Sequence, residues 1–432
     1  MSDHRALRFL TAGSVDDGKS TLIGRLLYDA RAILADQLDT LEKRAAGAQQ
    51  AAGGPSFDLS LLTDGLEAER EQGITIDVAY RYFATKQRKF IIADAPGHEQ
   101  YTRNMVTAAA GSDAAVVLVD ITKLDTHAVP VKLLAQTRRH ALLAQLLRVP
   151  SIVFAVNKLD AASDPAQAYE AVRAALLDFA EEAKMEVAGI VPVSALRGDN
   201  VTLPMDAPWY QGPSLLQLLE SLPTAQERTV GDLLIPVQYV ARDGGLDKNG
   251  TGDQPRTLWG RIAHGSVRAG DEVQLFPSRQ KAVVAEVRVA GERVDFAEAG
   301  QSAGLSLDRQ LDVSRGDWIA TPDTVRETNR FSATLAWLDT EPAVIGRKYA
   351  VRHGNRWVQA RIAAIESRLD IHSLQATDAH ELAVNEIGVV VIETQQPLPV
   401  EAYTSNRVGG SLIIVDPASN RTSGALLVRQ AA

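Results

Sequence analysis

The sequence predicts an α/β domain at the N-terminus, followed by two small all-β barrels. A phosphate-loop pattern at residues 13–20 stands between an apolar strand-like run and a helix-like segment. Further apolar runs alternate with helical segments up to residue 226. From residue 227 the pattern changes to short alternating runs separated by Gly-Asp turns, a spacing typical of closed barrels. We therefore expect domains at 1–226, 227–325 and 326–432.

Composition places the chain among globular proteins and limits its chemistry. Its 432 residues exceed what a single core usually holds. The absence of cysteine excludes disulfides, thiolate zinc sites and cysteine nucleophiles. The net charge is −9, and we find no basic stripe, secretory signal or apolar run of membrane-spanning length. We expect a cytoplasmic protein that binds neither nucleic acid nor membranes.

The segment from Gly13 to Ser20 fits G-x-x-x-x-G-K-[ST]. Its glycines allow backbone N–H groups to turn toward phosphates, Lys19 supplies a positive charge, and the Ser20 hydroxyl can hold Mg²⁺. A chance glycine-rich turn would lack the strand before it and the helix that we expect over 21–28. The segment therefore predicts a site for nucleotide phosphates.

Three further polar segments follow strand-like runs in the same domain. Asp94 ends the run 89–93, where it can hold Mg²⁺ through water, and Gly97 can offer its N–H to the terminal phosphate. Asn157 follows the run 151–156, and Ser194 follows the run 190–193. Because open α/β sheets bind ligands at the carboxyl ends of their strands, we expect these segments to meet around one nucleotide.

The segment Asn157-Lys158-Leu159-Asp160 resembles the N-K-x-D guanine-recognition motif of GTPases. Asp160 would accept two N–H bonds from guanine. Adenine offers neither donor, which would leave the carboxylate unpaired at a cost of about 1–3 kcal/mol, so GTP is preferred to ATP. The segment Ser194-Ala195-Leu196 matches the S-A-x segment whose backbone contacts the guanine oxygen in GTPases.

The segment 69–76 resembles the E-R-x-x-G-I-T-I of translation-type GTPases. This resemblance implies that Thr75 ligates Mg²⁺ while the γ-phosphate is present, and that His98 positions the attacking water. A flexible connector and a turn histidine are the plainer alternatives. Arg70 and Arg103 flank these segments, but no arginine finger can be assigned.

These motifs together define the candidate site. We expect catalytic roles for Lys19, Thr75 and His98, and Mg²⁺ ligation by Ser20, Thr75 and, through water, Asp94. The residues expected to bind GTP are Gly13, Ser14, Val15, Asp16, Asp17, Gly18, Lys19, Ser20, Thr21, Asp94, Gly97, Asn157, Lys158, Asp160, Ser194, Ala195 and Leu196.

Asp16 and Asp17 are an unusual pair for a phosphate loop, because adjacent carboxylates should repel the nucleotide. We expect Asp16 to help bind a monovalent cation beside the phosphates and Asp17 to face outward. The alternative is that both acids face solvent.

Over nearly its whole length the chain resembles the GTPase subunit of heterodimeric bacterial sulfate adenylyltransferase, most specifically at 13–28, 69–83 and 98–105. The resemblance implies a small partner subunit of the ATP-pyrophosphatase type, which makes adenosine 5′-phosphosulfate and pyrophosphate from ATP and sulfate while GTP hydrolysis drives the reaction. The alternative is a translation factor that delivers aminoacyl-tRNA. Ser14 in place of the elongation-factor histidine, Asp17 and the acidic charge balance argue against that alternative.

Two segments depart from the family pattern. Residues 121–137 are longer than expected, and residues 244–259 form a polar insertion. No second phosphate loop follows residue 400, so we expect no fused adenylylsulfate kinase. In the barrels, we expect four tryptophans to pack in a core or between barrels, with base-stacking platforms as the alternative: Trp259, Trp318, Trp337 and Trp357.

Overall fold

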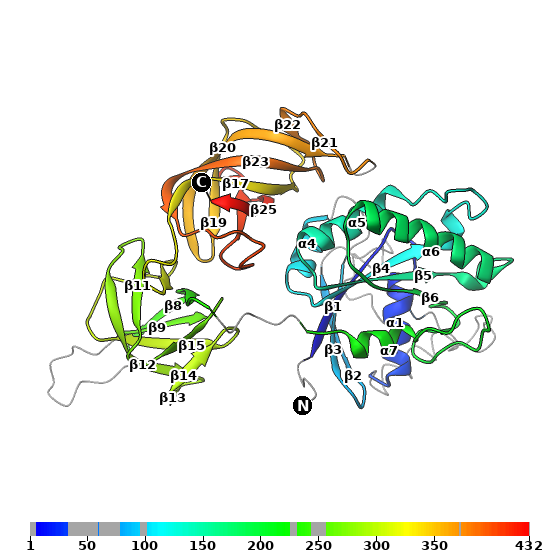
Figure 1. Ribbon diagram of the computed structural model, residues 1–432, viewed down its shortest axis with the longest axis horizontal. Coiled ribbons are helices and arrows are strands. Elements are labelled where there is room, and N and C mark those ends of the chain that lie inside the picture. Colours follow the sequence, from blue (N-terminus) through cyan, green and yellow to red (C-terminus); the bar gives the residue numbers. More distant parts are fainter. Residues whose placement is uncertain are drawn as a thin grey trace. The chain divides into compact units, whose positions relative to one another are not determined.

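The computed structural model describes residues 6–32, 59, 78–95, 102–224, 231–242, 256–370 and 373–431 (Figure 1). The chain divides into two compact units. The first comprises Met1–Ala225 with Ile371–Leu374, and the second comprises Gln226–Asp370 with Gln375–Ala432.

The first unit contains a six-stranded sheet in the order β2-β3-β1-β4-β5-β6. All neighbours are parallel except the edge strand β2, which runs antiparallel to β3. Because the other strands are parallel, their carboxyl ends lie along one edge of the sheet. The strands are β1 (Leu7–Ala12), β2 (Ala79–Ala84), β3 (Lys89–Asp94), β4 (Ala114–Asp120), β5 (Ser151–Asn157) and β6 (Val187–Pro192).

Helices cover both faces of this sheet (Figure 1). The strands β4 and β5 are buried along their whole length, which explains why their sequences are apolar and rich in β-branched residues without alternation. One face packs against α1 and α7, whose leucines join a single apolar cluster with β1, β3 and β4. The helices are α1 (Lys19–Asp29), α4 (Thr102–Ala110), α5 (Ala135–Leu146), α6 (Pro165–Glu182) and α7 (Leu215–Ser221), with 3₁₀ turns η3 (Ile121–Lys123) and η4 (Leu159–Ala161).

The second unit is all-β among its described residues and begins with a sheet in the order β7-β16-β11-β12-β15-β9-β8. Its inner face holds a core of small and branched apolar side chains. In this part of the unit, β10 pairs with β14 in a separate two-stranded sheet, and β13 pairs with β12. The strands of this part are β7 (Leu234–Pro236), β8 (Tyr239–Arg242), β9 (Arg256–Arg261), β10 (Ser266–Arg268), β11 (Glu272–Phe276), β12 (Lys281–Val289), β13 (Glu292–Val294), β14 (Phe296–Glu298), β15 (Ser302–Leu307) and β16 (Trp318–Ala320).

The C-terminal part of this unit forms a closed barrel, because β19 pairs with both β24 and β20 in the order β19-β24-β25-β17-β23-β20. The fold class expected from the sequence is confirmed, while the boundary at 325/326 stays a prediction. The strands of this part, in which β18 and β22 pair in a separate two-stranded sheet, are β17 (Thr328–Trp337), β18 (Ala343–Val344), β19 (Lys348–His353), β20 (Arg356–Leu369), β21 (Ala376–Thr377), β22 (Glu381–Leu382), β23 (Ile387–Leu398), β24 (Ser411–Val415) and β25 (Thr422–Ala431).

Buried aromatic packing joins the two largest sheets of the second unit. The fully buried ring of Trp318 stacks on His353 with centroids 4.4 Å apart, and Trp337 lies in the C-terminal core. The expectation of core packing is wrong for Trp357, whose side chain is 52% exposed. Side chains alternate along a strand, so the inward-facing Val358 turns Trp357 toward solvent.

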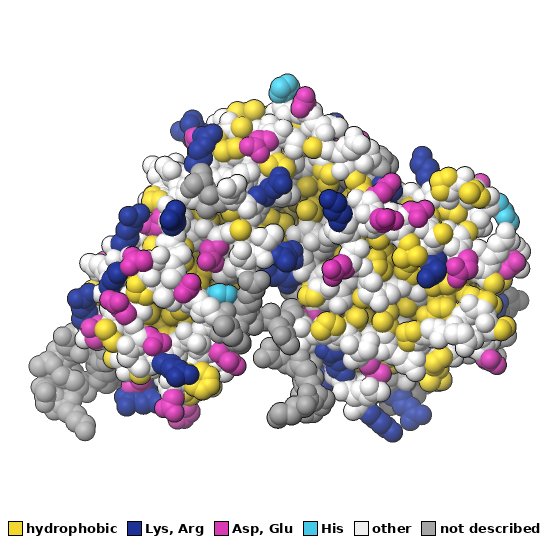
Figure 2. All heavy atoms as spheres, viewed as in Figure 1, with side chains coloured by type: hydrophobic (Ala, Val, Ile, Leu, Met, Phe, Trp, Pro, Cys, Tyr) yellow, Lys and Arg dark blue, Asp and Glu magenta, His cyan; other side chains and the backbone are white. Residues whose placement is uncertain are grey.

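Charges are mixed over the visible face of each unit. Figure 2 shows basic and acidic side chains interspersed there, without a continuous basic band. Within the described ranges, we find no helix that combines the length and the apolar character needed to cross a membrane.

Candidate nucleotide-binding site

The structure gathers most of the expected site residues at the carboxyl edge of the sheet. Gly13 directly follows β1, Asp94 ends β3, and Asn157 ends β5. Ser194 comes two residues after β6. Thr75, Gly97 and His98 lie outside the described residues, so the roles expected for them stay predictions.

The phosphate loop leads directly into the first turn of α1. No side chain caps this helix, so the N–H groups of its first turn can bind an anion. Gly18 has φ +91°, and a Cβ atom there would lie 2.5 Å from Asn157 Nδ2. Glycine is therefore required at this position both by the backbone conformation and by the close approach of the asparagine.

Lys19 is held inside the loop by backbone carbonyls. Its Nζ donates to Gly13 O at 3.0 Å and to Ser14 O at 2.8 Å. Burial lowers the pKa of Lys19, against the opposing effects of the Asp94 and Asp17 carboxylates. The carbonyl oxygens that accept from the Lys19 ammonium group carry no net charge. A phosphate in the loop would give this buried group an anionic partner.

Ser20 and Asp94 offer oxygen atoms for a magnesium ion. Ser20 lies in the first turn of α1, and the buried Asp94 accepts a hydrogen bond from Thr11 Oγ1 at 3.4 Å. Among the described residues, no cluster of three or more His, Asp or Glu side chains could hold a metal. A hydroxyl ligand and a carboxylate that acts through water fit Mg²⁺, which takes its remaining ligands from water and phosphates.

The structure corrects the expectation for Asp17. Its side chain is fully buried instead of facing outward: Oδ2 accepts a hydrogen bond from Ser14 N at 2.6 Å, and Oδ1 lies 2.8 Å from Lys123 Nζ. The reason is that η3 brings Lys123 against the loop and neutralises the carboxylate. Asp16 is exposed with φ +64°, and its role in cation binding stays a prediction.

The buried Asn157 connects the phosphate loop to the segment 194–196. Its Nδ2 donates to Asp17 O at 2.8 Å, and its Oδ1 accepts from Ala195 N at 3.0 Å. The amide thus satisfies one backbone group in each loop. The two loops that would contact opposite ends of a nucleotide are therefore fixed relative to each other by a single side chain.

The expected base-reading carboxylate lies on the same edge. Asp160 Oδ1 accepts a hydrogen bond from Ser194 Oγ at 2.6 Å, and its side chain keeps 15% exposure, so it remains accessible to a base. Lys158, two residues earlier, has φ +65° and forms an ion pair with Asp120 Oδ2 at 2.7 Å. Burial raises the pKa of Asp120, but hydrogen bonds from Lys158 and Thr122 outweigh this effect and lower it.

Sequence reasoning missed Arg25 as well as Lys123. Arg25 is buried in α1 and donates to Ala195 O at 3.3 Å and to Leu196 O. Gly198 has φ +88°, and a Cβ atom there would lie 3.3 Å from the Arg25 side chain. A signal was present, because Arg25 interrupts the apolar stripe of α1 at a position that helical periodicity places on the buried face.

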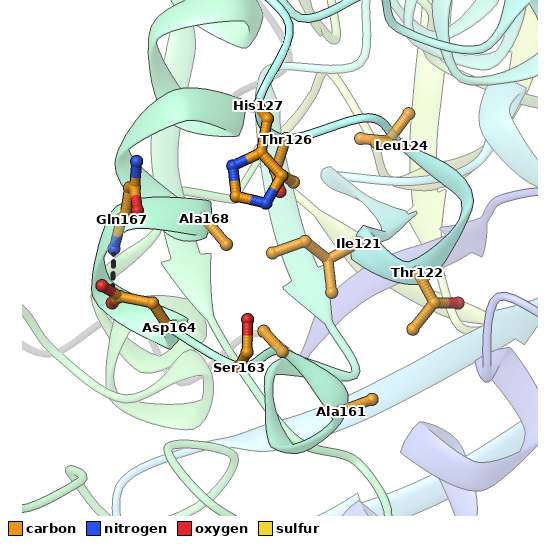
Figure 3. Close-up of a pocket in the computed structure, with 11 residues that line it drawn as sticks. Ile121, Thr122, Leu124, Thr126, His127, Ala161, Ser163, Asp164, Gln167 and Ala168 are labelled. Carbon is orange, nitrogen blue, oxygen red and sulfur yellow. Dashed lines mark hydrogen bonds between the residues drawn. The ribbon is translucent and has the colours of Figure 1, made fainter.

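A cavity of about 300 Å³ lies beside this site, between the segment after β4 and the start of α6 (Figure 3). The ring of His127 and the hydroxyl of Ser163 point into it. At its rim, Asp164 accepts a hydrogen bond from the backbone N–H of Gln167 at 3.1 Å. Neither the phosphate loop nor Asp160 lines this cavity, so it is distinct from the candidate nucleotide site.

Comparisons with protein families define the class. The model described as the elongation factor Tu GTP binding domain matches residues 4–227, which is more than half of the chain. The model described as GTP-eEF1A C-terminal domain-like matches residues 330–429. Fold and site together thus define a GTPase of the translation-factor superfamily.

Curated relatives narrow this class. Sulfate adenylyltransferase subunit 1 of Laribacter hongkongensis (strain HLHK9) is 44% identical over 98% of this chain and 85% of its own length. The bifunctional enzyme CysN/CysC of Mycobacterium tuberculosis (strain ATCC 25618 / H37Rv) is 45% identical over 98% of this chain and 67% of its own length. The chain belongs to the family of sulfate adenylyltransferase subunit 1, as its sequence led us to expect.

A solved structure of sup35 complexed with GDP also matches, with TM-score 0.43 and 22% identity over 100% of this chain and 95% of that one. This likeness is too distant to add to the assignment.

Proposed function

We propose that this chain hydrolyses GTP at the carboxyl edge of its sheet, and that hydrolysis drives the formation of adenosine 5′-phosphosulfate and pyrophosphate from ATP and sulfate on a separate subunit. Membership of the family gives the reaction. The observation that supports the nucleotide site most directly is the position of Asn157, which bonds to the phosphate loop at 2.8 Å and to the 194–196 segment at 3.0 Å.

Each described side chain has a proposed task. Lys19, held by the carbonyls of Gly13 and Ser14, exchanges these partners for phosphate oxygens. Asp160 accepts the two N–H groups of guanine. Ser20, directly, and Asp94, through water, would hold Mg²⁺, which would supply positive charge to the phosphates during transfer.

Two further tasks fall on residues outside the described ranges. We propose that Thr75 ligates the metal while the γ-phosphate is present, and that His98 orients the attacking water. Removal of a group with the second role costs roughly 10²- to 10⁴-fold in rate in comparable enzymes.

We propose that the partner is a small catalytic subunit of the ATP-pyrophosphatase type. Coupling requires this partner to bind the GTP and GDP states with different affinity, because a ligand shifts an equilibrium only through its differential affinity. The name subunit 1 of the curated relatives supports a separate partner.

The proposal is tested by co-purifying the chain with the small subunit and measuring pyrophosphate release from ATP and sulfate. We expect release to require GTP and to stop with a non-hydrolysable GTP analogue. Full activity without GTP would contradict the coupling.

Exchanging the nucleobase tests the site itself. An Asp160→Asn variant replaces an acceptor by a donor, which should weaken GTP binding and favour xanthosine triphosphate, whose 2-oxo group accepts where guanine donates. The same substitution at the exposed Asp206 of this domain serves as the control. If Asp160→Asn kept the guanine preference of the parent, Asp160 would not be the base-reading residue.

A further inference from the structure

Four charged side chains form a network beneath the phosphate loop, and none of their pairings follows from the motifs. Lys123 Nζ lies 2.8 Å from Asp17 Oδ1 and 3.8 Å from Asp120 Oδ2. Lys158 Nζ lies 2.7 Å from the same Asp120 oxygen. The network therefore runs from the phosphate loop, through the end of β4, to the base-reading segment.

The two carboxylates in this network are inaccessible to water. The side chains of Asp17 and Asp120 are 0% exposed, whereas that of Lys123 is 32% exposed. A buried carboxylate without a cationic partner is strongly unfavourable, and the loss of one partner of a buried pair leaves an uncompensated charge. Since Lys158 is the nearer partner of Asp120, Lys123 serves mainly to compensate Asp17.

Local structure presents Lys123 to the loop in one orientation. Asp120 accepts hydrogen bonds from Thr122 N at 3.0 Å and Thr122 Oγ1 at 2.6 Å, which cap the 3₁₀ turn η3. Lys123 is the last residue of this turn, and its Nζ also donates to the carbonyl oxygen of Val15. The lysine thus contacts both the backbone and the carboxylate of the phosphate loop.

Asp17 in turn shapes the loop. Its Oδ2 accepts the N–H of Ser14 at 2.6 Å, and its own carbonyl accepts the amide of Asn157 at 2.8 Å. Without Lys123, the Asp17 carboxylate would lose its ion-pair partner and keep only the more distant attraction of Lys19. It would then either face the bound phosphates with most of its negative charge uncompensated or turn out of the loop. Turning out would break the bond to Ser14. Both results disfavour a triphosphate, the first by repulsion and the second by loss of loop order.

We propose that Lys123 is a positioning residue of the nucleotide site: it neutralises Asp17 and so holds the phosphate loop in the form that accepts phosphates. This inference rests on the proposed function, because it assumes that a guanosine nucleotide binds at this loop. The pairing also explains how a phosphate loop can contain two adjacent acids: Asp16 is exposed, and Asp17 pairs with Lys123 from the segment after β4.

A double-mutant cycle tests the pairing. We expect Lys123→Met to weaken binding of a fluorescent GDP analogue about 10- to 100-fold by equilibrium titration, because the variant leaves Asp17 unpaired. Asp17→Asn removes the charge that Lys123 compensates, so adding Lys123→Met to Asp17→Asn should change affinity by less than about threefold. Lys132→Met, at an exposed lysine in the same connection, is the matched control and should bind like the parent.

The outcomes separate the inference from the function on which it rests. If the parent chain bound no guanosine nucleotide, the proposed function would fail. If the parent bound tightly and Lys123→Met bound equally well, the inference alone would be overturned. The inference would also be overturned if Lys123→Met lowered nucleotide affinity equally in the parent and in Asp17→Asn. A lysine with a merely structural role would give this result, because the effect of its replacement would not depend on the charge at Asp17. Circular dichroism of the five proteins checks that each is folded.

Discussion

Replacing Asn157 by alanine should loosen both nucleotide-contacting loops at once. The substitution removes two buried hydrogen bonds, from Asn157 Nδ2 to Asp17 O at 2.8 Å and from Ala195 N to Asn157 Oδ1 at 3.0 Å. Each backbone group left unsatisfied costs about 1–3 kcal/mol. Allowing for water that enters the space of the lost side chain, we expect a total of about 2–4 kcal/mol.

The cost of the two lost hydrogen bonds should lower the affinity for nucleotide. The two bonds hold both loops in place, so in the variant the ligand itself must order the loops. At about 1.4 kcal/mol per tenfold change, the expected loss of GDP affinity is about 30- to 1,000-fold. Equilibrium titration with a fluorescent GDP analogue measures it, and urea unfolding of the same protein measures the loss of stability.

Asn200 provides the matched control for this experiment. It is equally buried, its Nδ2 donates to Pro192 O at 2.8 Å, and its Oδ1 accepts from Met205 N at 3.2 Å. Asn200→Ala should therefore lower the free energy of unfolding by a similar amount while changing GDP affinity less than about threefold. If both variants lost affinity equally, or if Asn157→Ala bound like the parent, the reasoning that Asn157 links the two loops would be refuted.

Two further predictions concern buried side chains that no motif identifies. Arg25→Met keeps an unbranched apolar stem but removes the donors to Ala195 O and Leu196 O. We expect GDP affinity to fall about tenfold, whereas ADP affinity should stay unchanged because ADP does not use the 194–196 segment. Titration with both nucleotides measures the two affinities. An unaltered preference for guanine would contradict the prediction. Burial lowers the pKa of His353 from 6.5 to about 4. The unfolded chain therefore takes up a proton below pH 6.5 while the folded unit does not. The contribution of His353 to the free energy of unfolding is fully present above pH 6.5, and it should fall by about 3 kcal/mol as the pH drops toward 4. Urea unfolding followed by tryptophan fluorescence between pH 4.5 and 7 should show this slope in the parent and a flatter one in His353→Phe; equal slopes would exclude His353 as the titrating group.

The arrangement of the first domain could be predicted because its signals are local. The phosphate-loop pattern needs only a strand before it and a helix after it, and β1 and α1 are found at those places. Asn157 and Ser194 were expected to meet because each follows a strand-like run, and parallel strands bring their carboxyl ends together. Thus the edge of the sheet and the order of its segments were predictable from periodicity and motif spacing.

The partners of individual charges could not be predicted in the same way. Lys123 contacts Asp17 across 106 residues of sequence, and Arg25 contacts Ala195 across 170. Neither separation leaves a spacing pattern in the chain. The expectation that Asp17 faces outward was wrong for this reason. Among its sequence neighbours, a second carboxylate in the loop has no cation to pair with, so exposure to solvent is the expected alternative.

By itself, the sequence determined the class of fold, the family and the edge of the sheet at which a nucleotide is expected. These follow from the hydrophobic periodicity of helices and strands and from the phosphate-loop motif, and both are patterns of residues close together in the sequence. The tertiary structure decided which charges are buried and what neutralises them. Burial and ion pairing depend on segments that meet only after folding: the 3₁₀ turn after β4 turns Asp17 inward, and α1 places Arg25 beneath the 194–196 segment.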